Sequence, residues 1–189
     1  AQMEATSARR ERDVLAVSLY GSQNYGMDDM FSDFDMKATV LPSLMDVAQN
    51  KKLISTTHMG GNGLIDIKDI RLMSQNLKKQ SINYVEILFT KFRVVNPLYK
   101  KELELLYSNR EMLARYDQGR ALSSFVGMAY NKVREIKKNI YESNRAALLK
   151  DLISILRLSE FQVRYINGEK YEDILVTENA LFLLDLKKD

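Results

Sequence analysis

The spacing of apolar residues changes along this chain, and that change constrains the fold more than any other feature. Before Ile70, apolar residues form short runs of strand length, as in residues 14–20, or alternate with polar ones, as in residues 33–40. After Ile70 they recur at helical intervals, as at Leu148, Leu152 and Ile155. The sequence therefore predicts an α+β fold: a small mixed β-sheet with helices, followed by a C-terminal helical bundle.

A boundary between the two patterns is expected near Pro97, because proline removes a backbone donor and interrupts regular structure. We predict one unit over residues 1–95 and a helical domain over residues 96–189. Residues 1–12 are polar and fit a helix. Because the sequence starts at Ala1 rather than at a methionine, we expect a processed or truncated product.

Composition excludes several classes of site. The chain has no cysteine and one histidine, which excludes disulfides, a cysteine nucleophile and zinc sites built from several histidines. A bound metal would need oxygen ligands, which favours Mg²⁺ or Mn²⁺. No run approaches 18 apolar residues, so we expect no membrane contact and a cytoplasmic protein. The net charge of +3 is too small to indicate nucleic-acid binding by itself.

Two carboxylates stand two residues apart at Asp33 and Asp35. On a strand they would project from the same face, within roughly 7 Å of each other. Like charges so close raise a pKa or recruit a cation, and Mg²⁺ suits oxygen ligands. The alternative is that both lie at a solvated strand start, with Asp33 capping a turn.

A second feature, Gly21-Ser22, follows the apolar run. Glycine allows a sharp turn and a close approach to a ligand, and a serine that opens a helix adds its hydroxyl to backbone N–H groups that favour an anion. The pattern is neither a P-loop nor a dinucleotide fingerprint. Taken alone it is also compatible with an ordinary turn.

Together, YGSQNYG at residues 20–26 and SDFD at residues 32–35 resemble the nucleotidyltransferase superfamily typified by DNA polymerase beta, especially its small bacterial and phage branch of predicted nucleotidyltransferases. The resemblance covers roughly residues 14–90. It implies a strand, a Gly-Ser turn into a helix, a strand with Asp-x-Asp, and a third carboxylate on a later strand. The helical half carries no motif of this kind.

The resemblance implies a role for each matched residue. Gly21 and Ser22 would hold the β- and γ-phosphates of a nucleoside triphosphate. Asp33 and Asp35 would bind Mg²⁺ or Mn²⁺. Asp66, in the middle of an expected strand, would be the third carboxylate and a further metal ligand. All three acids would then be catalytic, in a core that spans residues 1–95.

Several nearby residues have alternative interpretations. Asp69 is a second candidate for the third carboxylate, although an aspartate before Ile70 is typical of a helix N-cap. Lys68 and Arg71 would contact phosphate or form surface ion pairs. Glu86 lies in an apolar run, where an unpaired carboxylate is costly, so we expect it to pair with a Lys or Arg between the two halves; the alternative is a place at the edge of the site.

The implied function is a Mg²⁺-dependent transfer of a nucleoside monophosphate from a triphosphate to an acceptor hydroxyl, with release of pyrophosphate. The acceptor would be a protein side chain, an RNA end or a small molecule. Residues 120–150 hold seven Lys or Arg and two Glu, which fits contact with a polyanion or an ordinary solvated face. The alternative function is a catalytically inactive nucleotide- or partner-binding regulatory module on the same fold.

Overall fold

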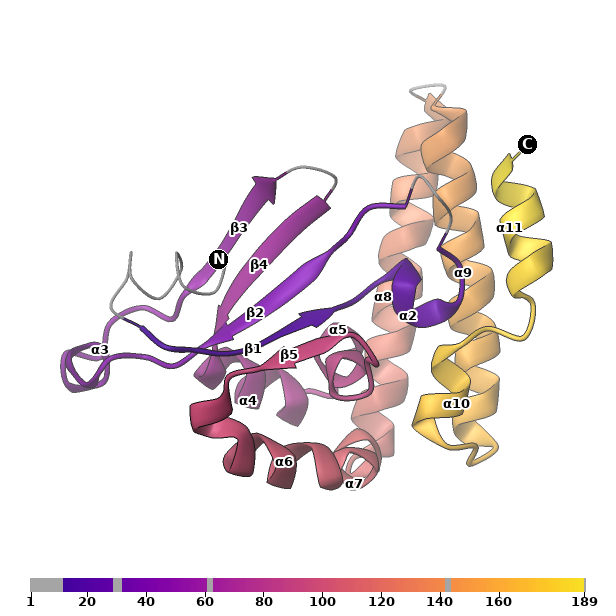
Figure 1. The fold of residues 1–189 in the computed structure, drawn as a ribbon. Helices are drawn as coiled ribbons and strands as arrows, with labels where there is room; N and C mark the ends of the chain where they lie inside the picture. The colour runs from indigo at the N-terminus through magenta and orange to yellow at the C-terminus, as the bar shows by residue number, and fades with distance from the viewer. Residues whose placement is uncertain (1–11, 29–31, 61–62, 142–143, 189) are drawn as a thin grey trace.

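A mixed five-stranded sheet and a set of helices make up the computed structural model, which describes residues 12–28, 32–60, 63–141 and 144–188 (Figure 1). The strands run in the order β3-β4-β2-β1-β5. Their bounds are β1 Val14–Leu19, β2 Met36–Val40, β3 Ser55–Gly60, β4 Gly63–Asp69 and β5 Arg93–Val95. This arrangement confirms the predicted α+β class and its mixed sheet. The helix predicted over residues 1–12 lies outside the described residues, apart from Arg12.

Helices fill most of the chain after β4, as the apolar spacing predicts. In the described ranges, no helix is both long and apolar enough to cross a membrane. The helices and 3₁₀ turns are α2 Ser22–Tyr25, α3 Leu44–Ala48, α4 Ile70–Lys78, α5 Ile82–Val85, η1 Glu86–Leu88, η2 Pro97–Tyr99, α6 Lys100–Ser108, α7 Arg110–Arg115, α8 Gln118–Tyr141, α9 Arg145–Ile166, α10 Tyr171–Leu175 and α11 Ala180–Lys188.

The two central strands bring distant segments together. β1 pairs antiparallel with β2, and β2 pairs parallel with β4, so that Lys37 lies opposite Asp66. A parallel pair needs a crossover connection, which the chain supplies through α3 and β3. Side chains at β1 and β2 are mostly buried, because helices or neighbouring strands cover them. The sheet therefore presents the start of β2 and the middle of β4 side by side.

Two strands, β3 and β5, are not predicted from the sequence, and the reasons are physical. β5 has only three residues, with Val94 exposed, and it ends two residues before Pro97. β3 is an edge strand made mainly of polar, exposed residues, so it lacks the alternation that marks a half-buried strand. Both strands form through pairing with a neighbour, β5 with β1 and β3 with β4, rather than through their own apolar pattern.

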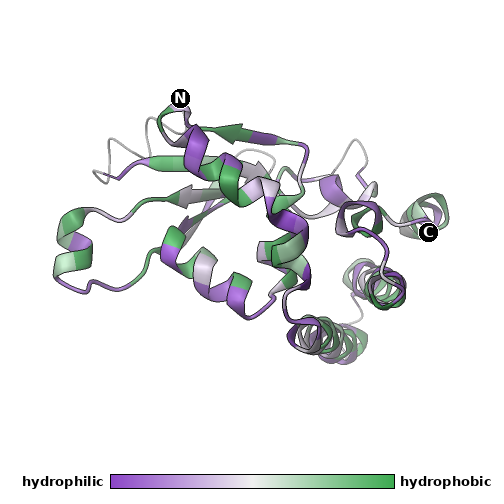
Figure 2. Cartoon of the chain, turned by 90° about the horizontal axis from the view of Figure 1, so that it is seen from below, coloured by the Kyte–Doolittle hydropathy of each residue, from purple (hydrophilic) through white to green (hydrophobic). Residues whose placement is uncertain are grey.

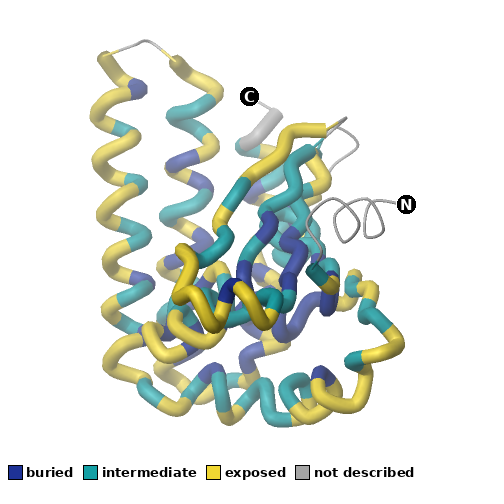
Figure 3. Tube along the Cα trace, turned by 90° about the vertical axis from the view of Figure 1, so that its left-hand side faces the viewer, coloured by how far each residue is buried: buried dark blue, intermediate teal, exposed yellow. Residues whose placement is uncertain are grey.

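Helices α8 and α9 form a long antiparallel hairpin beside the sheet, seen nearly end-on in Figure 2. An aromatic cluster joins the hairpin to the rest of the chain: Phe125 packs edge-on against Phe161 with ring centroids 5.0 Å apart, and Phe89 stacks on Tyr171 at 4.6 Å. The same core contains residues of α4, α5 and η1. Deeply buried residues lie in the central strands and in the adjoining part of the hairpin (Figure 3). The two predicted parts therefore share one hydrophobic core, and a domain boundary at residue 95 stays a prediction.

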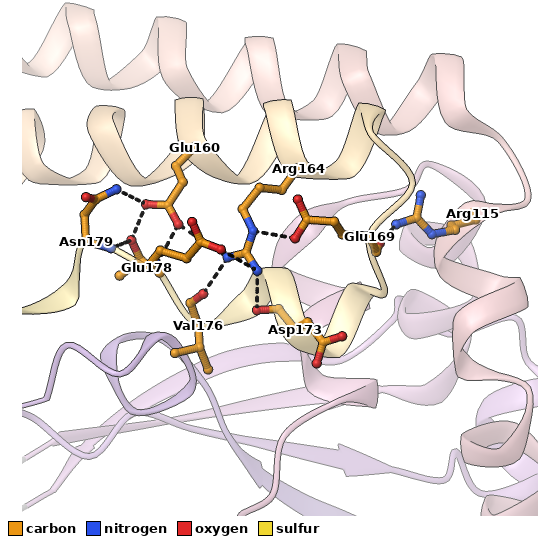
Figure 4. Close-up of polar contacts among 9 residues, drawn as sticks. Arg115, Glu160, Arg164, Glu169, Asp173, Val176, Glu178 and Asn179 are labelled. Carbon is orange, nitrogen blue, oxygen red and sulfur yellow. Dashed lines mark hydrogen bonds and ion pairs between the residues drawn. The ribbon is translucent and has the colours of Figure 1, made fainter.

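The C-terminal segment is held on α9 by a polar network (Figure 4). Arg164 donates to the backbone carbonyls of Asp173 and Val176, and its guanidinium pairs with Glu169 at 2.8 Å. Glu160, one turn earlier, accepts hydrogen bonds from the segment that leads into α11, including one from the backbone of Glu178 at 2.7 Å. These contacts fix α10 and the chain that follows it against α9.

Close backbone packing at the start of β4 generates a stability prediction. A methyl group on Gly63 would lie 2.2 Å from the carbonyl oxygen of Phe34, whereas one on Gly60 would meet nothing within 4 Å. Gly63→Ala should therefore lower the free energy of unfolding by about 1–3 kcal/mol, the usual cost of overpacking. Gly60→Ala is the matched control and should change it by less than about 0.5 kcal/mol. Urea unfolding of both variants checks this, and equal values would contradict the packing.

Candidate functional site

The Gly21-Ser22 turn opens a helix, as predicted. β1 ends at Leu19, and Gly21 then adopts φ 79° and ψ −143°, a conformation that favours glycine, before the four-residue α2 begins at Ser22. The turn faces the acidic segment of the chain: a methyl group on Gly21 would lie 3.8 Å from Oδ2 of Asp35. The predicted phosphate-binding turn and one of the predicted metal ligands are therefore neighbours.

The prediction that Asp33 and Asp35 lie within a strand is wrong. β2 begins only at Met36, because its partner β1 ends at Leu19, opposite Met36. One further hydrogen bond, from the Tyr20 N–H to the Asp35 carbonyl at 3.0 Å, closes the ladder. Asp33 is exposed and Asp35 is half-buried in the extended segment just before the strand. The period-two argument for a shared face therefore does not apply to this pair.

Electrostatics nevertheless links the two acids. Burial raises the pKa of Asp35, and the negative charge of Asp33 raises it further. A hydrogen bond from the Leu64 backbone and the positive charge of Lys150 offset this only in part, so that the pKa of Asp35 stays above its ordinary value. A cation at this position would relieve the repulsion.

Asp66 lies in the middle of β4, beside β2, and protein groups bind both of its oxygens. Thr57 Oγ1 donates to Oδ1 at 2.5 Å, and the Tyr20 hydroxyl donates to Oδ2 at 3.2 Å. Lys68 Nζ lies 3.4 Å from Oδ1. Burial raises the pKa of Asp66, but the Thr57 hydrogen bond and the charges of Lys68 and Lys37 lower it more, so the carboxylate stays ionised at neutral pH.

Asp69 is the N-cap of α4, which confirms its structural interpretation. Its fully buried carboxylate accepts from the backbone N–H of Arg71 at 2.9 Å and from Arg71 Nη2 at 2.7 Å. Lys68 and Arg71 are likewise engaged in ion pairs with neighbouring acids rather than free for phosphate. Asp66 is therefore better placed than Asp69 for the third-carboxylate role, which stays a prediction.

The predicted metal ligands approach one another without forming a ready-made cage. Asp35 is electrostatically coupled to both Asp33 and Asp66. Within the described ranges, however, no three acidic or histidine side chains are grouped closely enough to hold one metal ion. The hard oxygen donors of Asp33 and Asp35, with their unrelieved repulsion, fit a divalent cation; Asp66 would first exchange its protein hydrogen bonds.

Two buried ionisable side chains, Lys37 and Glu86, lie next to this site. Lys37 of β2 is 3% exposed and donates to the Asn83 carbonyl at 3.1 Å, with its ammonium 4.2 Å from the centre of the Tyr20 ring. Burial lowers the pKa of Lys37, and the charges of Glu86 and Asp66 oppose that shift. Sequence analysis missed Lys37, although a lone lysine within the apolar strand was the available signal.

Glu86 is the second of these residues, and its side chain is fully buried. Burial raises its pKa above the ordinary value, and the Tyr25 hydroxyl, which donates to Oε2, and the charges of Arg157 and Lys37 offset this only in part. Arg157 belongs to α9 and Lys37 to β2, so positive charge from both halves acts on Glu86, but the side chain that binds its carboxyl group is that of Tyr25, and the expected ion pair stays a prediction. The backbone of Gly21 also lowers the pKa of Glu86, so this side chain lies next to the Gly21 turn.

The helical half also reaches the acidic side of the site. Lys150, Ile153 and Arg157 follow one another along one side of α9 at spacings of three and four residues, so they share a face. Lys150 interacts electrostatically with Asp35, Ile153 packs with Met27, and Arg157 lies on Tyr25. This face of α9 therefore borders the segment that runs from the turn to the acids.

Comparisons with other proteins add little to this geometry. The sequence matches no known protein family and no curated protein. Among solved structures, the chain is similar to a nucleotidyltransferase-like protein from Exiguobacterium sibiricum 255-15, with 10% identity over 99% of this chain and 72% of that one, and a TM-score of 0.38. At that score the likeness carries no weight for function, which depends on the residues described above.

The Asp69 cap generates a prediction with a defined pH dependence. Burial raises the Asp69 pKa, but hydrogen bonds from Arg71 lower it more, so the folded pKa lies below the unfolded one. The cap therefore stabilises the fold above about pH 4, and its contribution is lost as pH falls through the folded pKa. Asp69→Ala should lower the free energy of unfolding by about 1–2 kcal/mol at pH 7.

Urea titrations of wild type and Asp69→Ala at pH 7 and at successively lower pH values check this prediction, and the difference between the two proteins should shrink on acidification. The same variant should retain nucleotidyl transfer. A variant that is fully stable yet loses turnover would transfer the third-carboxylate role from Asp66 to Asp69.

Proposed function

We propose that this protein is a metal-dependent nucleotidyltransferase that moves a nucleoside monophosphate from a triphosphate to an acceptor hydroxyl and releases pyrophosphate. The observation that carries the proposal is the approach of the Gly21-Ser22 turn to Asp35, with Asp66 on the adjoining strand. A phosphate-binding turn, a cation-attracting carboxylate pair and a further ionised carboxylate are the groups such a transfer requires.

In the proposed reaction each group has one task. The backbone of Gly21 and the hydroxyl of Ser22 bind the β- and γ-phosphates, and Asp33 and Asp35 hold Mg²⁺ or Mn²⁺. The bound ion supplies charge neutralisation on the triphosphate and lowers the pKa of the acceptor hydroxyl. Asp66 is a further metal ligand. It accepts the proton of the acceptor hydroxyl while the hydroxyl oxygen bonds to the α-phosphorus. The bond from that phosphorus to pyrophosphate then breaks.

The basic residues of α8 and α9 indicate which partners the protein would bind. Lys150 is exposed and close enough to Asp35 to affect its pKa, so it is placed to meet the phosphates of a nucleotide. On α8, Tyr130 and Tyr141 are 64% and 90% exposed, and Arg134 and Lys137 lie between them on the same side of the helix. Two exposed basic side chains flanked by exposed aromatic ones fit a polyanionic acceptor better than a buried core face.

One observation favours the alternative, a binding module without catalysis. Both oxygens of Asp66 are bound by Thr57, Tyr20 and Lys68, an arrangement that is already satisfied without a metal. Incubation with each radiolabelled nucleoside triphosphate and Mg²⁺ in cell lysate separates the two functions. Transfer of label identifies both the base and the acceptor, whereas nucleotide binding with no labelled product would establish the binding module.

The carboxylate pair generates the first functional prediction. Asp35→Asn should abolish Mg²⁺-dependent nucleotide binding, because a metal ligand is lost. Its thermal midpoint should stay unchanged or rise: the pKa of Asp35 is raised in the folded protein, so its charge opposes folding at neutral pH. Asp33→Asn should behave alike, and Asp28→Asn, an exposed acid nearby, is the control. A large fall in the midpoint with binding intact would make the pair structural.

Asp66 generates the second functional prediction. If it accepts the proton, Asp66→Ala should lower turnover by at least about 10²-fold, the usual scale for a positioned general base. Affinity for the triphosphate should change little, because that part of the substrate rests on the Gly21-Ser22 turn and the carboxylate pair. Steady-state kinetics with separate binding measurements check this, and unchanged turnover would remove Asp66 from the catalytic set.

A further inference from the structure

The Gly21–Tyr25 segment is too short to hold its own position. α2 has four residues, buries none of them and has no side-chain cap at its N-terminus. Helices this short are unstable without tertiary contacts, and glycines with positive φ stand at both ends, Gly21 and Gly26. The geometry of the phosphate-binding turn must therefore be set by what its side chains contact elsewhere.

Tyr25 makes the contacts that could set it. Its hydroxyl donates to Oε2 of Glu86, and its ring lies under the guanidinium of Arg157, whose central carbon is 3.5 Å from the ring centroid. The Tyr25 carbonyl accepts from the Thr177 N–H at 3.2 Å. The last residue of α2 is thus attached to η1, α9 and the segment after α10.

The polar groups here are poorly explained by stability alone. Glu86 is fully buried and Arg157 is 7% exposed, and Oε1 of Glu86 and Nη1 of Arg157 have no hydrogen-bond partner among the described residues. Buried ion pairs are often no more stabilising than well-packed apolar side chains of similar volume. Burying these polar groups costs free energy, and the cluster lies next to the proposed substrate-binding turn. Its presence there is better explained by the geometry that it imposes on the turn.

We propose that Tyr25, Glu86 and Arg157 are positioning residues for nucleotide binding: they fix the Gly21-Ser22 turn relative to Asp35, and through Arg157 they make nucleotide affinity depend on the helical half. The inference rests on the proposed nucleotide site. None of the three needs to touch the nucleotide. The carboxyl group of Glu86 acts on the turn through the Tyr25 hydroxyl, and Arg157 acts on Glu86 and on the Tyr25 ring.

Tyr25→Phe tests the hydroxyl alone, since it retains the ring beneath Arg157. Tyr171→Phe is the matched control: Tyr171 lies in the same core, is 1% exposed, and its hydroxyl has no hydrogen-bond partner in the described part of the chain. Binding of a fluorescent nucleoside triphosphate with Mg²⁺ should weaken about tenfold or more in Tyr25→Phe, the scale for a buried polar group left without its hydrogen bond. It should change less than about twofold in Tyr171→Phe.

A second pair of variants tests the link to α9. Arg157→Lys keeps a positive charge near Glu86 but loses the planar contact with Tyr25, and should also weaken nucleotide binding. Arg115→Lys is its control, because Arg115 lies over Tyr165 in the same manner, 4.5 Å from the ring centroid, and has no contact with the turn among the described residues. Equal loss of affinity in both variants would contradict the assignment.

Amide hydrogen exchange over residues 21–26, measured without nucleotide, makes the test independent of the proposed function. Faster exchange in Tyr25→Phe than in Tyr171→Phe, at similar thermal midpoints, supports positioning. Equal exchange overturns it, as does a loss of stability in Tyr25→Phe with unchanged nucleotide affinity. If wild type binds no nucleotide, the proposed function fails, and the exchange measurement still shows whether these residues set the turn.

Discussion

A single buried carboxylate, that of Glu86, organises the centre of this molecule. A carboxyl group away from water needs polar or charged groups nearby, and here they come from three separate parts of the chain: Tyr25 after β1, Lys37 in β2 and Arg157 in α9. Each of these residues is placed by its own element. The sheet, the short helix α2 and the helical hairpin consequently meet around the carboxyl group of Glu86.

The site next to this carboxyl group depends on strand order as much as on residue type. Parallel pairing of β2 with β4 places Asp66 opposite Lys37, two residues beyond Asp35. Because β1 ends at Leu19, opposite Met36, the residues before Met36 lie outside the sheet, and Asp35 faces the turn that follows β1. The chemistry proposed for the protein is in this sense a property of its topology.

Local signals predicted what local physics determines. The Gly21 turn, the Asp69 cap and the helical second half each follow from a few adjacent residues or from one periodicity, and the structure confirms all three. β3 and β5 form because a partner strand is present, and the start of β2 is set by where β1 ends, so their own sequences carry no sufficient signal. The roles of Lys37 and Arg157 depend on contacts across the fold. In the sequence, each of these two residues is marked only as a charged residue in an otherwise apolar pattern.

The shared aromatic core has a consequence for how such a protein is divided or recombined. Phe89, from the first half, stacks on Tyr171, and the residues of α4 and α5 are buried against α8 and α9. A fragment cut near residue 95 would present these apolar surfaces to water and leave Glu86 without Arg157. The sheet unit is therefore not a portable module. Any chimera built on it must carry the α8–α9 hairpin along with the sheet.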